Sequence, residues 1–76
     1  MDSTKKKITN TEYRLGRNIR KVRMAKRLTQ EQLAEKIHTS WTWVAHIETG
    51  RETPNLKMLE KIARALGVKV VDLIPF

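Results

Sequence analysis

The segment from Leu28 to Gly50, LTQEQLAEKIHTSWTWVAHIETG, constrains the fold of this 76-residue chain more than any other part of it. Thr29 and Gln32 have the spacing of a capping box, in which the hydroxyl accepts from a first-turn amide and the Gln side chain reaches back to the Thr29 backbone. Apolar residues then recur at helical spacing, at Leu33, Ala34 and Ile37. We therefore predict a short amphipathic helix that begins directly after Thr29.

A second short helix is predicted after a tight turn. Ser40 is a good N-cap residue, and Gly50 is typical of the left-handed position that ends a helix. Val44 and Ile47, with Glu48 beside them, would face inward. At 100° per residue the opposite face carries Thr42, Ala45, His46 and Thr49. A helix-turn-helix of this kind most often places its second helix in the major groove of DNA.

The charge of the chain indicates a polyanionic partner. Lys and Arg number 16 against 8 Asp and Glu, which gives a formal charge of +8. From Arg14 to Arg27 there are seven basic residues and no acidic one. Such a run can also be a solvated helix face, or a basic amphipathic helix that binds a membrane surface or a calmodulin-like protein. Because it adjoins the predicted helix-turn-helix, we expect double-stranded DNA as the partner and no membrane contact.

The composition gives little support to catalysis or to a cofactor. Cysteine is absent, and His38 and His46 have no metal-ligand spacing and no nucleophile pattern beside them. The three glycines form no phosphate-binding loop. We expect no enzyme activity, no cofactor, no metal and no small-molecule effector domain. The cysteine-free composition also favours a cytoplasmic, nucleoid-associated location.

The remaining residues predict three further helices and an all-α fold. Residues 1–8 read as a flexible basic arm and residues 9–76 as one domain. A capping box at Thr9 and Glu12 starts a first helix at Asn10, which ends near Lys26 or Arg27 and buries Leu15, Ile19 and Val22. Asn55 caps a fourth helix, ended by Gly67, that carries inward Leu56, Leu59, Ile62, Ala63 and Leu66. A short fifth helix covers roughly Val70 to Ile74.

The stretch from Leu15 to Leu73 resembles the DNA-binding domain of Cro and the phage repressors. The resemblance rests on LTQEQLA at the start of the second helix, IETG at the end of the third, and PNLKMLEKIARALGV across the fourth. It implies a compact five-helix bundle that binds, as a homodimer, an operator with two half-sites. The same family contains restriction-modification controllers and antitoxin-like regulators, so a protein-interaction module with secondary DNA binding is the alternative.

The resemblance also implies roles for individual residues. Trp41, Thr42 and His46 match positions that reach base edges, while Gln30 and Ser40 match phosphate contacts, to which we add Arg51 and Trp43. Trp41 could instead cover the neighbouring helix, and the place of Trp43 beside the inward face favours packing over DNA contact. In several members an arginine at the position of Arg23 pairs with a glutamate at the position of Glu48.

Three residues depart from the family pattern. Arg27 and His38 stand where glycine is common, after helices that would end in the left-handed conformation, at a cost of roughly 1 kcal/mol each. Lys69 stands where a small capping residue is usual, so we expect a poor start to the fifth helix.

The C-terminal sequence VKVVDLIPF predicts a dimer interface. Its helix is too short to bury every apolar residue, and Val68 and Leu73 match core positions of the family. The remaining apolar residues form the expected interface: Val70, Val71, Ile74 and Phe76. The alternative is that this tail folds back onto its own core.

Overall fold

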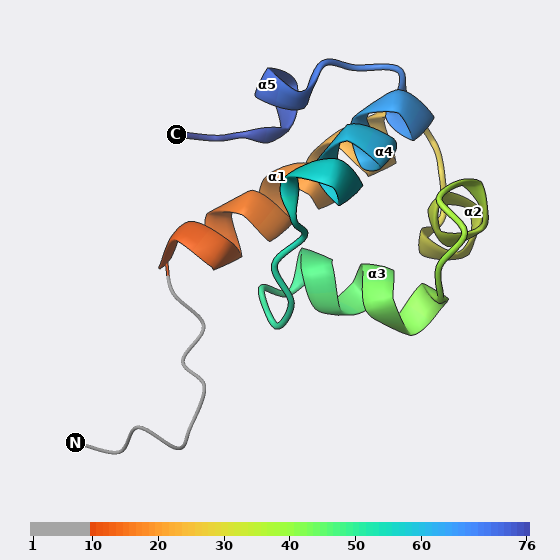
Figure 1. Ribbon diagram of the computed structural model, residues 1–76, viewed down its shortest axis with the longest axis horizontal. Coiled ribbons are helices and arrows are strands. Elements are labelled where there is room, and N and C mark those ends of the chain that lie inside the picture. The colour runs from red at the N-terminus through yellow and green to blue at the C-terminus, as the bar shows by residue number, and fades with distance from the viewer. Residues whose placement is uncertain (1–9) are drawn as a thin grey trace.

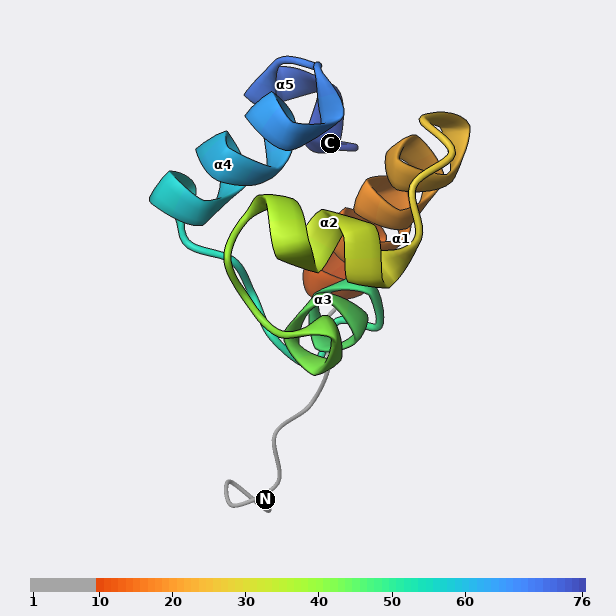
Figure 2. The ribbon, with the colours of Figure 1, turned by 90° about the vertical axis from the view of Figure 1, so that its right-hand side faces the viewer.

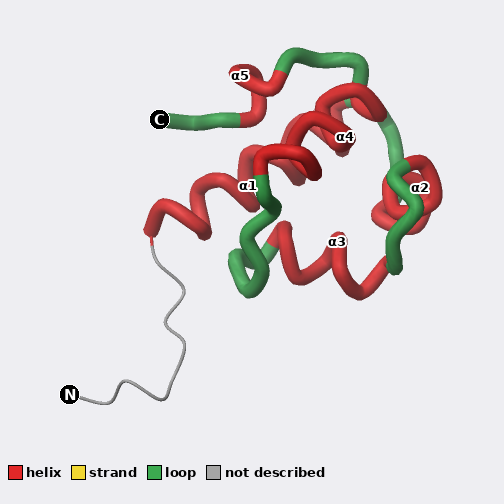
Figure 3. Tube along the Cα trace, in the orientation of Figure 1, coloured by secondary structure: helices red, strands yellow, loops and turns green. Residues whose placement is uncertain are grey.

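The computed structural model describes residues 10–76, which form five helices and no strand (Figures 1 and 3). The helices are α1 (Asn10–Ala25), α2 (Gln30–Lys36), α3 (Trp41–Glu48), α4 (Leu56–Leu66) and α5 (Val70–Leu73). The all-α, five-helix prediction is confirmed. The arm predicted over residues 1–8 and the capping role of Thr9 lie outside the described residues. Within residues 10–76, no helix has the length and apolar character needed to cross a membrane.

All five helices converge on one core. In Figure 2, α2 stands between α3 below and α4 above, while α1 runs alongside and α5 lies at the top. Each helix contributes one side chain that is at most 1% exposed, namely Ile19, Leu33, Ile47, Ile62 and Leu73. A core shared in this way fixes the position of every helix, including the short α3.

Side-chain caps start three of the helices as predicted. The amides of Gln32, Trp43 and Met58 donate to the side chains of Thr29, Ser40 and Asn55 at 3.0, 3.1 and 2.8 Å. Gln32 also completes the capping box, because its side-chain oxygen accepts from the Thr29 amide at 2.8 Å. Helix α5 has only half of such a box. The Lys69 amide donates to Asp72 at 2.9 Å, but a lysine ammonium cannot accept in return.

The first four helices end in the same way. A residue with positive φ follows each helix, at Arg27 (60°), His38 (58°), Gly50 (82°) and Gly67 (70°). The next amide then donates to a carbonyl five residues earlier, at distances of 2.9 to 3.2 Å. The left-handed conformation expected at Arg27 and His38 is therefore confirmed, and two of the four ends lack the glycine that adopts it without strain.

The structure corrects two details of the predicted core. Leu56 is 67% exposed, because the first turn of α4 extends past the neighbouring helices and the buried face begins at Leu59 (Figure 2). On α1 the buried residues are Leu15, Gly16, Ile19 and Arg23, while Val22 is half-buried. Periodicity alone did not identify Gly16 or Arg23 as inward residues, since neither is a typical core type.

Gly16 allows α1 and α3 to approach closely. A Cβ at this position would lie 2.2 Å from the Ile47 carbonyl oxygen and 2.9 Å from that of Glu48. Both neighbours are backbone atoms at the end of α3, so neither can move aside by a change of rotamer. Any larger side chain must push the two helices apart.

We expect Gly16→Ala to lower the free energy of unfolding by about 1–3 kcal/mol, as overpacking of a well-packed contact does. The sign of this change in the free energy of unfolding tests the close approach, because Gly→Ala inside an uncrowded helix stabilises a protein by roughly 0.5–1 kcal/mol. Urea unfolding followed by circular dichroism gives the difference. A gain in stability would show that the helices do not meet at this residue.

Candidate nucleic-acid interface

Helix α3 has one face in the core and one face outside it. Val44, Ile47 and Glu48 are buried at 2%, 1% and 3% exposure. We define the outer face of α3 by the residues on its other side: Trp41, Thr42, Ala45, His46 and Thr49. Trp41 is 54% exposed, Thr42 and Thr49 are exposed, and Ala45 and His46 are half-buried. In Figure 1 this helix lies along the lower edge of the molecule, away from α4 and α5.

A buried ion pair holds α3 against α1. Arg23 Nε donates to Glu48 Oε2 at 2.6 Å and Arg23 Nη2 donates to Glu48 Oε1 at 3.0 Å, a bidentate arrangement. The two residues are only 8% and 3% exposed. Arg23 Nη1 also donates to the Leu28 carbonyl at 2.6 Å, which ties the start of the helix-turn-helix to the same group. The structure thus brings together the pair predicted from the sequence.

Two further hydrogen bonds extend from this pair to the surface. Gln30 Nε2 donates to Glu48 Oε1 at 3.1 Å, and Trp41 Nε1 donates to Gln30 Oε1 at 3.0 Å. Arg23, Glu48, Gln30 and Trp41 therefore form one hydrogen-bonded chain from the core to the outer face of α3. From the sequence, Gln30 and Trp41 were expected to act separately, as a phosphate contact and a base contact. Their common place as first residues of α2 and α3 was the available signal, but only the angle between the helices brings them into contact.

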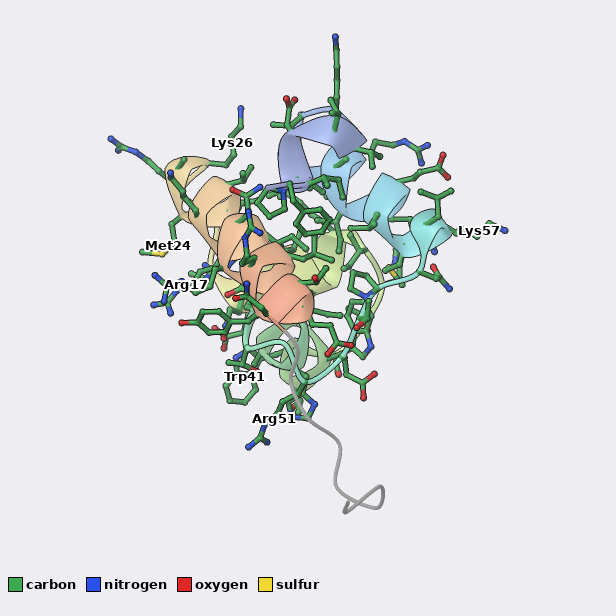
Figure 4. All side chains as sticks on the ribbon, turned by 90° about the vertical axis from the view of Figure 1, so that its left-hand side faces the viewer. Arg17, Met24, Lys26, Trp41, Arg51 and Lys57 are labelled. Atoms are coloured by element: carbon green, nitrogen blue, oxygen red, sulfur yellow. The ribbon has the colours of Figure 1, made fainter. Side chains whose placement is uncertain are left out.

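The other residues expected to contact phosphate have different surroundings. Ser40 is exposed, and its oxygen accepts the Trp43 amide as the helix cap, which leaves its O–H able to donate outward. Trp43 is half-buried and packs against the core, in agreement with the packing alternative. Arg51 is exposed just beyond α3. Figure 4 shows that Arg51 and Trp41, at opposite ends of α3, extend from the same lower side of the molecule.

The basic stretch of α1 does not form one uniform surface. Arg23 points inward, whereas the other six cations between Arg14 and Arg27 are exposed. Four of them (Arg14, Arg17, Arg20 and Lys21) line an open groove of about 870 Å³ beside Pro75. Two of the four have local partners, since Arg14 donates to the Pro75 carbonyl at 3.1 Å and Arg17 to the Tyr13 hydroxyl at 2.8 Å. In Figure 4, Arg17 lies on the same side of the molecule as Met24 and Lys26, with Lys57 on the other side.

The apolar C-terminal residues divide into two groups. Val71 and Phe76 are 68% and 60% exposed, whereas Val70 and Ile74 are half-buried and pack against the core of the same chain. The fold-back alternative therefore applies to Val70 and Ile74. Helix α5 lies at the top of Figure 1, on the side of the molecule away from α3. Any contact made through Val71 and Phe76 leaves the outer face of α3 uncovered.

The sequence of this chain is similar to a known domain family and to two known proteins. Residues 14–74 match the helix-turn-helix domain family. The immunity repressor protein of Bacillus phage phi105 is 45% identical over 56 residues, 74% of this chain and 39% of the repressor. Multiprotein-bridging factor 1 of Candida albicans is 36% identical over 63 residues, 83% of this chain and 42% of that protein. This chain thus spans about two fifths of the length of these relatives.

A solved structure of similar size also matches. The restriction-modification controller protein C.AhdI from Aeromonas hydrophila superposes with a TM-score of 0.78 at 31% identity. The match covers 80% of this chain and 92% of the controller.

The buried pair leads to a prediction for stability. We expect Glu48→Ala to lower the free energy of unfolding by roughly 3–5 kcal/mol, because it leaves a buried arginine without its carboxylate. The double change Arg23→Met with Glu48→Leu should cost less, since it removes both buried charges. Glu35→Ala, at an exposed acid of α2, is the control and should change stability by no more than about 0.5 kcal/mol. The measurement is the urea midpoint; equal effects of Glu48→Ala and Glu35→Ala would contradict a buried pair.

Proposed function

Because the chain belongs to the helix-turn-helix domain family, we propose that it is a transcriptional regulator that binds double-stranded DNA in a sequence-specific manner. It acts as a homodimer on an operator with two related half-sites. The observation that carries the proposal is the asymmetry of α3, whose inner face is held in the core while its outer face is uncovered. A helix presented in this way can enter a major groove without any rearrangement of the fold.

The charge distribution supports a DNA partner. Six exposed cations lie between Arg14 and Arg27, and the whole chain carries a formal charge of +8. Contacts between such cations and phosphates release counterions, so they add affinity without regard to sequence. This electrostatic attraction holds the protein on DNA of any sequence, and the outer face of α3 then discriminates among sequences.

We assign base reading to Thr42, His46 and Trp41. Within the described residues, the Thr42 hydroxyl and the His46 imidazole make no hydrogen bond, so both can serve base edges. Ser40, Gln30 and Arg51 would contact phosphates. One amide hydrogen of Gln30 remains for that purpose after its bond to Glu48. Trp43 would support this cluster from the core side.

The homodimer is assigned to the exposed apolar residues of the C-terminus. Val71 and Phe76 are the most exposed members of the predicted interface, and the Arg14 guanidinium lies over the Phe76 ring at 5.5 Å from its centroid. A two-fold axis through them makes the contact self-complementary, as a closed dimer requires. Two linked half-site contacts then bind far more tightly than one, because the second is intramolecular.

A second candidate function is that of a protein-bridging module for which DNA binding is secondary. The observation in its favour is the 36% identity with a protein named multiprotein-bridging factor. The two functions differ in one measurable property, which is whether the isolated chain selects a defined duplex sequence.

Selection from random duplex DNA should therefore yield a sequence with two related half-sites. The affinity for that sequence should fall by ~10³–10⁵-fold between about 50 and 200 mM salt, if about 6–10 phosphates are contacted. We expect Thr42→Ala and His46→Ala to reduce discrimination among operator variants by on the order of 1 kcal/mol where a base contact is lost.

Arg51→Ala is the control for that experiment, because the loss of a phosphate contact should weaken all sequences about equally. A flat salt response would count against the electrostatic contribution. An unchanged sequence preference in Thr42→Ala and His46→Ala would show that α3 does not read the bases.

The dimer assignment is tested with a matched pair of substitutions. Val71→Asp should give a folded monomer with reduced operator affinity, because it places a charge in the interface. Leu56→Asp is the control, since Leu56 is an equally exposed aliphatic residue, 67% against 68%, on α4. Neither change should alter the free energy of unfolding by more than about 0.5 kcal/mol. Sedimentation equilibrium reports the association state; a dimer that survives Val71→Asp but not Leu56→Asp would move the interface to α4.

A further inference from the structure

Trp41 presents an apolar ring on the outer face of α3, not a hydrogen-bond donor. The indole has a single polar group, its Nε1–H, which donates to Gln30 Oε1 at 3.0 Å. The side chain is nevertheless 54% exposed. With the N–H group already bonded, what remains for a ligand is hydrocarbon.

The orientation of the ring is held from the core. Gln30 Oε1 accepts from Trp41 while its Nε2 donates to Glu48 Oε1 at 3.1 Å, so both ends of the amide are in use. Glu48 is in turn bound by Arg23 at 2.6 and 3.0 Å. Turning the indole N–H toward a phosphate would break the bond to Gln30. The structure therefore favours the ring edge, and not the N–H, as the part of Trp41 that meets a partner.

Two other residues of the outer face of α3 offer no free hydrogen-bond donor. Ala45 lies one helical turn after Trp41 and offers only a methyl group. The Thr49 hydroxyl donates to the backbone of α3, to the Ala45 and His46 carbonyls at 3.0 and 3.3 Å. Along the outer face of α3 itself, the side chains that offer an unbonded polar group are therefore Thr42 and His46, and Trp41 and Ala45 offer apolar groups.

We propose that Trp41 selects a pyrimidine with a 5-methyl group, either thymine or 5-methylcytosine, at one position of each half-site. The methyl group at C5 is the apolar feature that base pairs offer in the major groove, and apolar side chains are what recognise it. This inference rests on the DNA binding proposed above and assigns the chemistry of one contact within it. Gln30 acts here as a positioning residue.

The test uses the full chain and the duplex obtained by selection. Each thymine of a half-site is replaced singly by deoxyuridine, which removes only the methyl group. At one position we expect the wild-type affinity to fall about fourfold, the effect of leaving one methyl-sized group unburied. At that position a cytosine·guanine pair should bind weakly, and 5-methylcytosine·guanine should recover part of the loss. The comparison of the cytosine and 5-methylcytosine duplexes shows whether Trp41 recognises thymine alone or either pyrimidine that carries a 5-methyl group.

Variants of the chain assign the effect to Trp41. In Trp41→Ala the thymine-to-deoxyuridine ratio at that position should become close to one. Trp41→Phe retains an apolar ring without an N–H group and should keep most of the ratio. Gln30→Ala should reduce the ratio and also lower the affinity for every duplex, because it releases the ring and loses a phosphate contact. Leu56→Ala, at an exposed apolar residue of α4, is the control and should leave the ratio unchanged.

The possible outcomes separate this inference from the proposed function. If the chain selects a sequence but no thymine position depends on Trp41, the methyl contact is wrong and sequence-specific DNA binding stands. If Trp41→Ala weakens the thymine and deoxyuridine duplexes equally and so leaves their ratio unchanged, Trp41 contacts the DNA backbone and not a methyl group, which also overturns the inference. If no duplex sequence is selected, the proposed function fails and this inference fails with it.

Discussion

The bidentate contact between Arg23 and Glu48 is the interaction on which the arrangement of the helix-turn-helix depends. It joins the last turn of α1 to the end of α3, and its third donor reaches the Leu28 carbonyl just before α2. Replacing a buried pair of this kind with apolar residues is often tolerated, whereas removing one partner is costly. Its main consequence here is therefore geometric, because the guanidinium satisfies groups on three segments in one fixed orientation.

Gly16 complements this contact at a second point on α1. Gly16 and Arg23 are seven residues apart and so lie on the same face of the helix. The glycine lets the carbonyls of Ile47 and Glu48 come close, and the arginine binds the Glu48 side chain. One contact sets how near α3 lies to α1, and the other sets how it is turned. A helix of only eight residues needs such constraints, since it is too short to be stable alone.

The same carboxylate couples the core to the outer surface. Glu48 Oε1 accepts from both Arg23 and Gln30, and Gln30 accepts from Trp41. A chain of hydrogen bonds in a low-dielectric interior is more rigid than its members alone, and losing one member leaves its neighbours unsatisfied. A substitution at the buried end of this chain should therefore change the surface that α3 presents, although it lies behind that surface.

The sequence by itself determined the local structure of this protein. The left-handed helix ends at Arg27 and His38 were expected only through the family resemblance. The caps at Thr29, Ser40 and Asn55 and the left-handed ends at Gly50 and Gly67 involve hydrogen bonds that span three to five residues. Such bonds depend on residue type and on the backbone geometry of one turn, so a single sequence is enough to predict them. The Arg23–Glu48 pair was predicted as well, but only through a family resemblance, since nothing in a run of seven basic residues distinguishes the one that turns inward.

Only the tertiary structure decided the contacts between helices. The Trp41–Gln30 bond spans 11 residues and the Arg23–Glu48 pair spans 25, and the close approach at Gly16 involves Ile47. Leu56 has the periodicity of a core residue yet is exposed, because α4 begins beyond the edge of its neighbours. These features depend on the angles and offsets at which helices pack, which arise from the whole core at once. Helical periodicity predicts which side of a helix is apolar, but not where along that side a neighbouring helix ends.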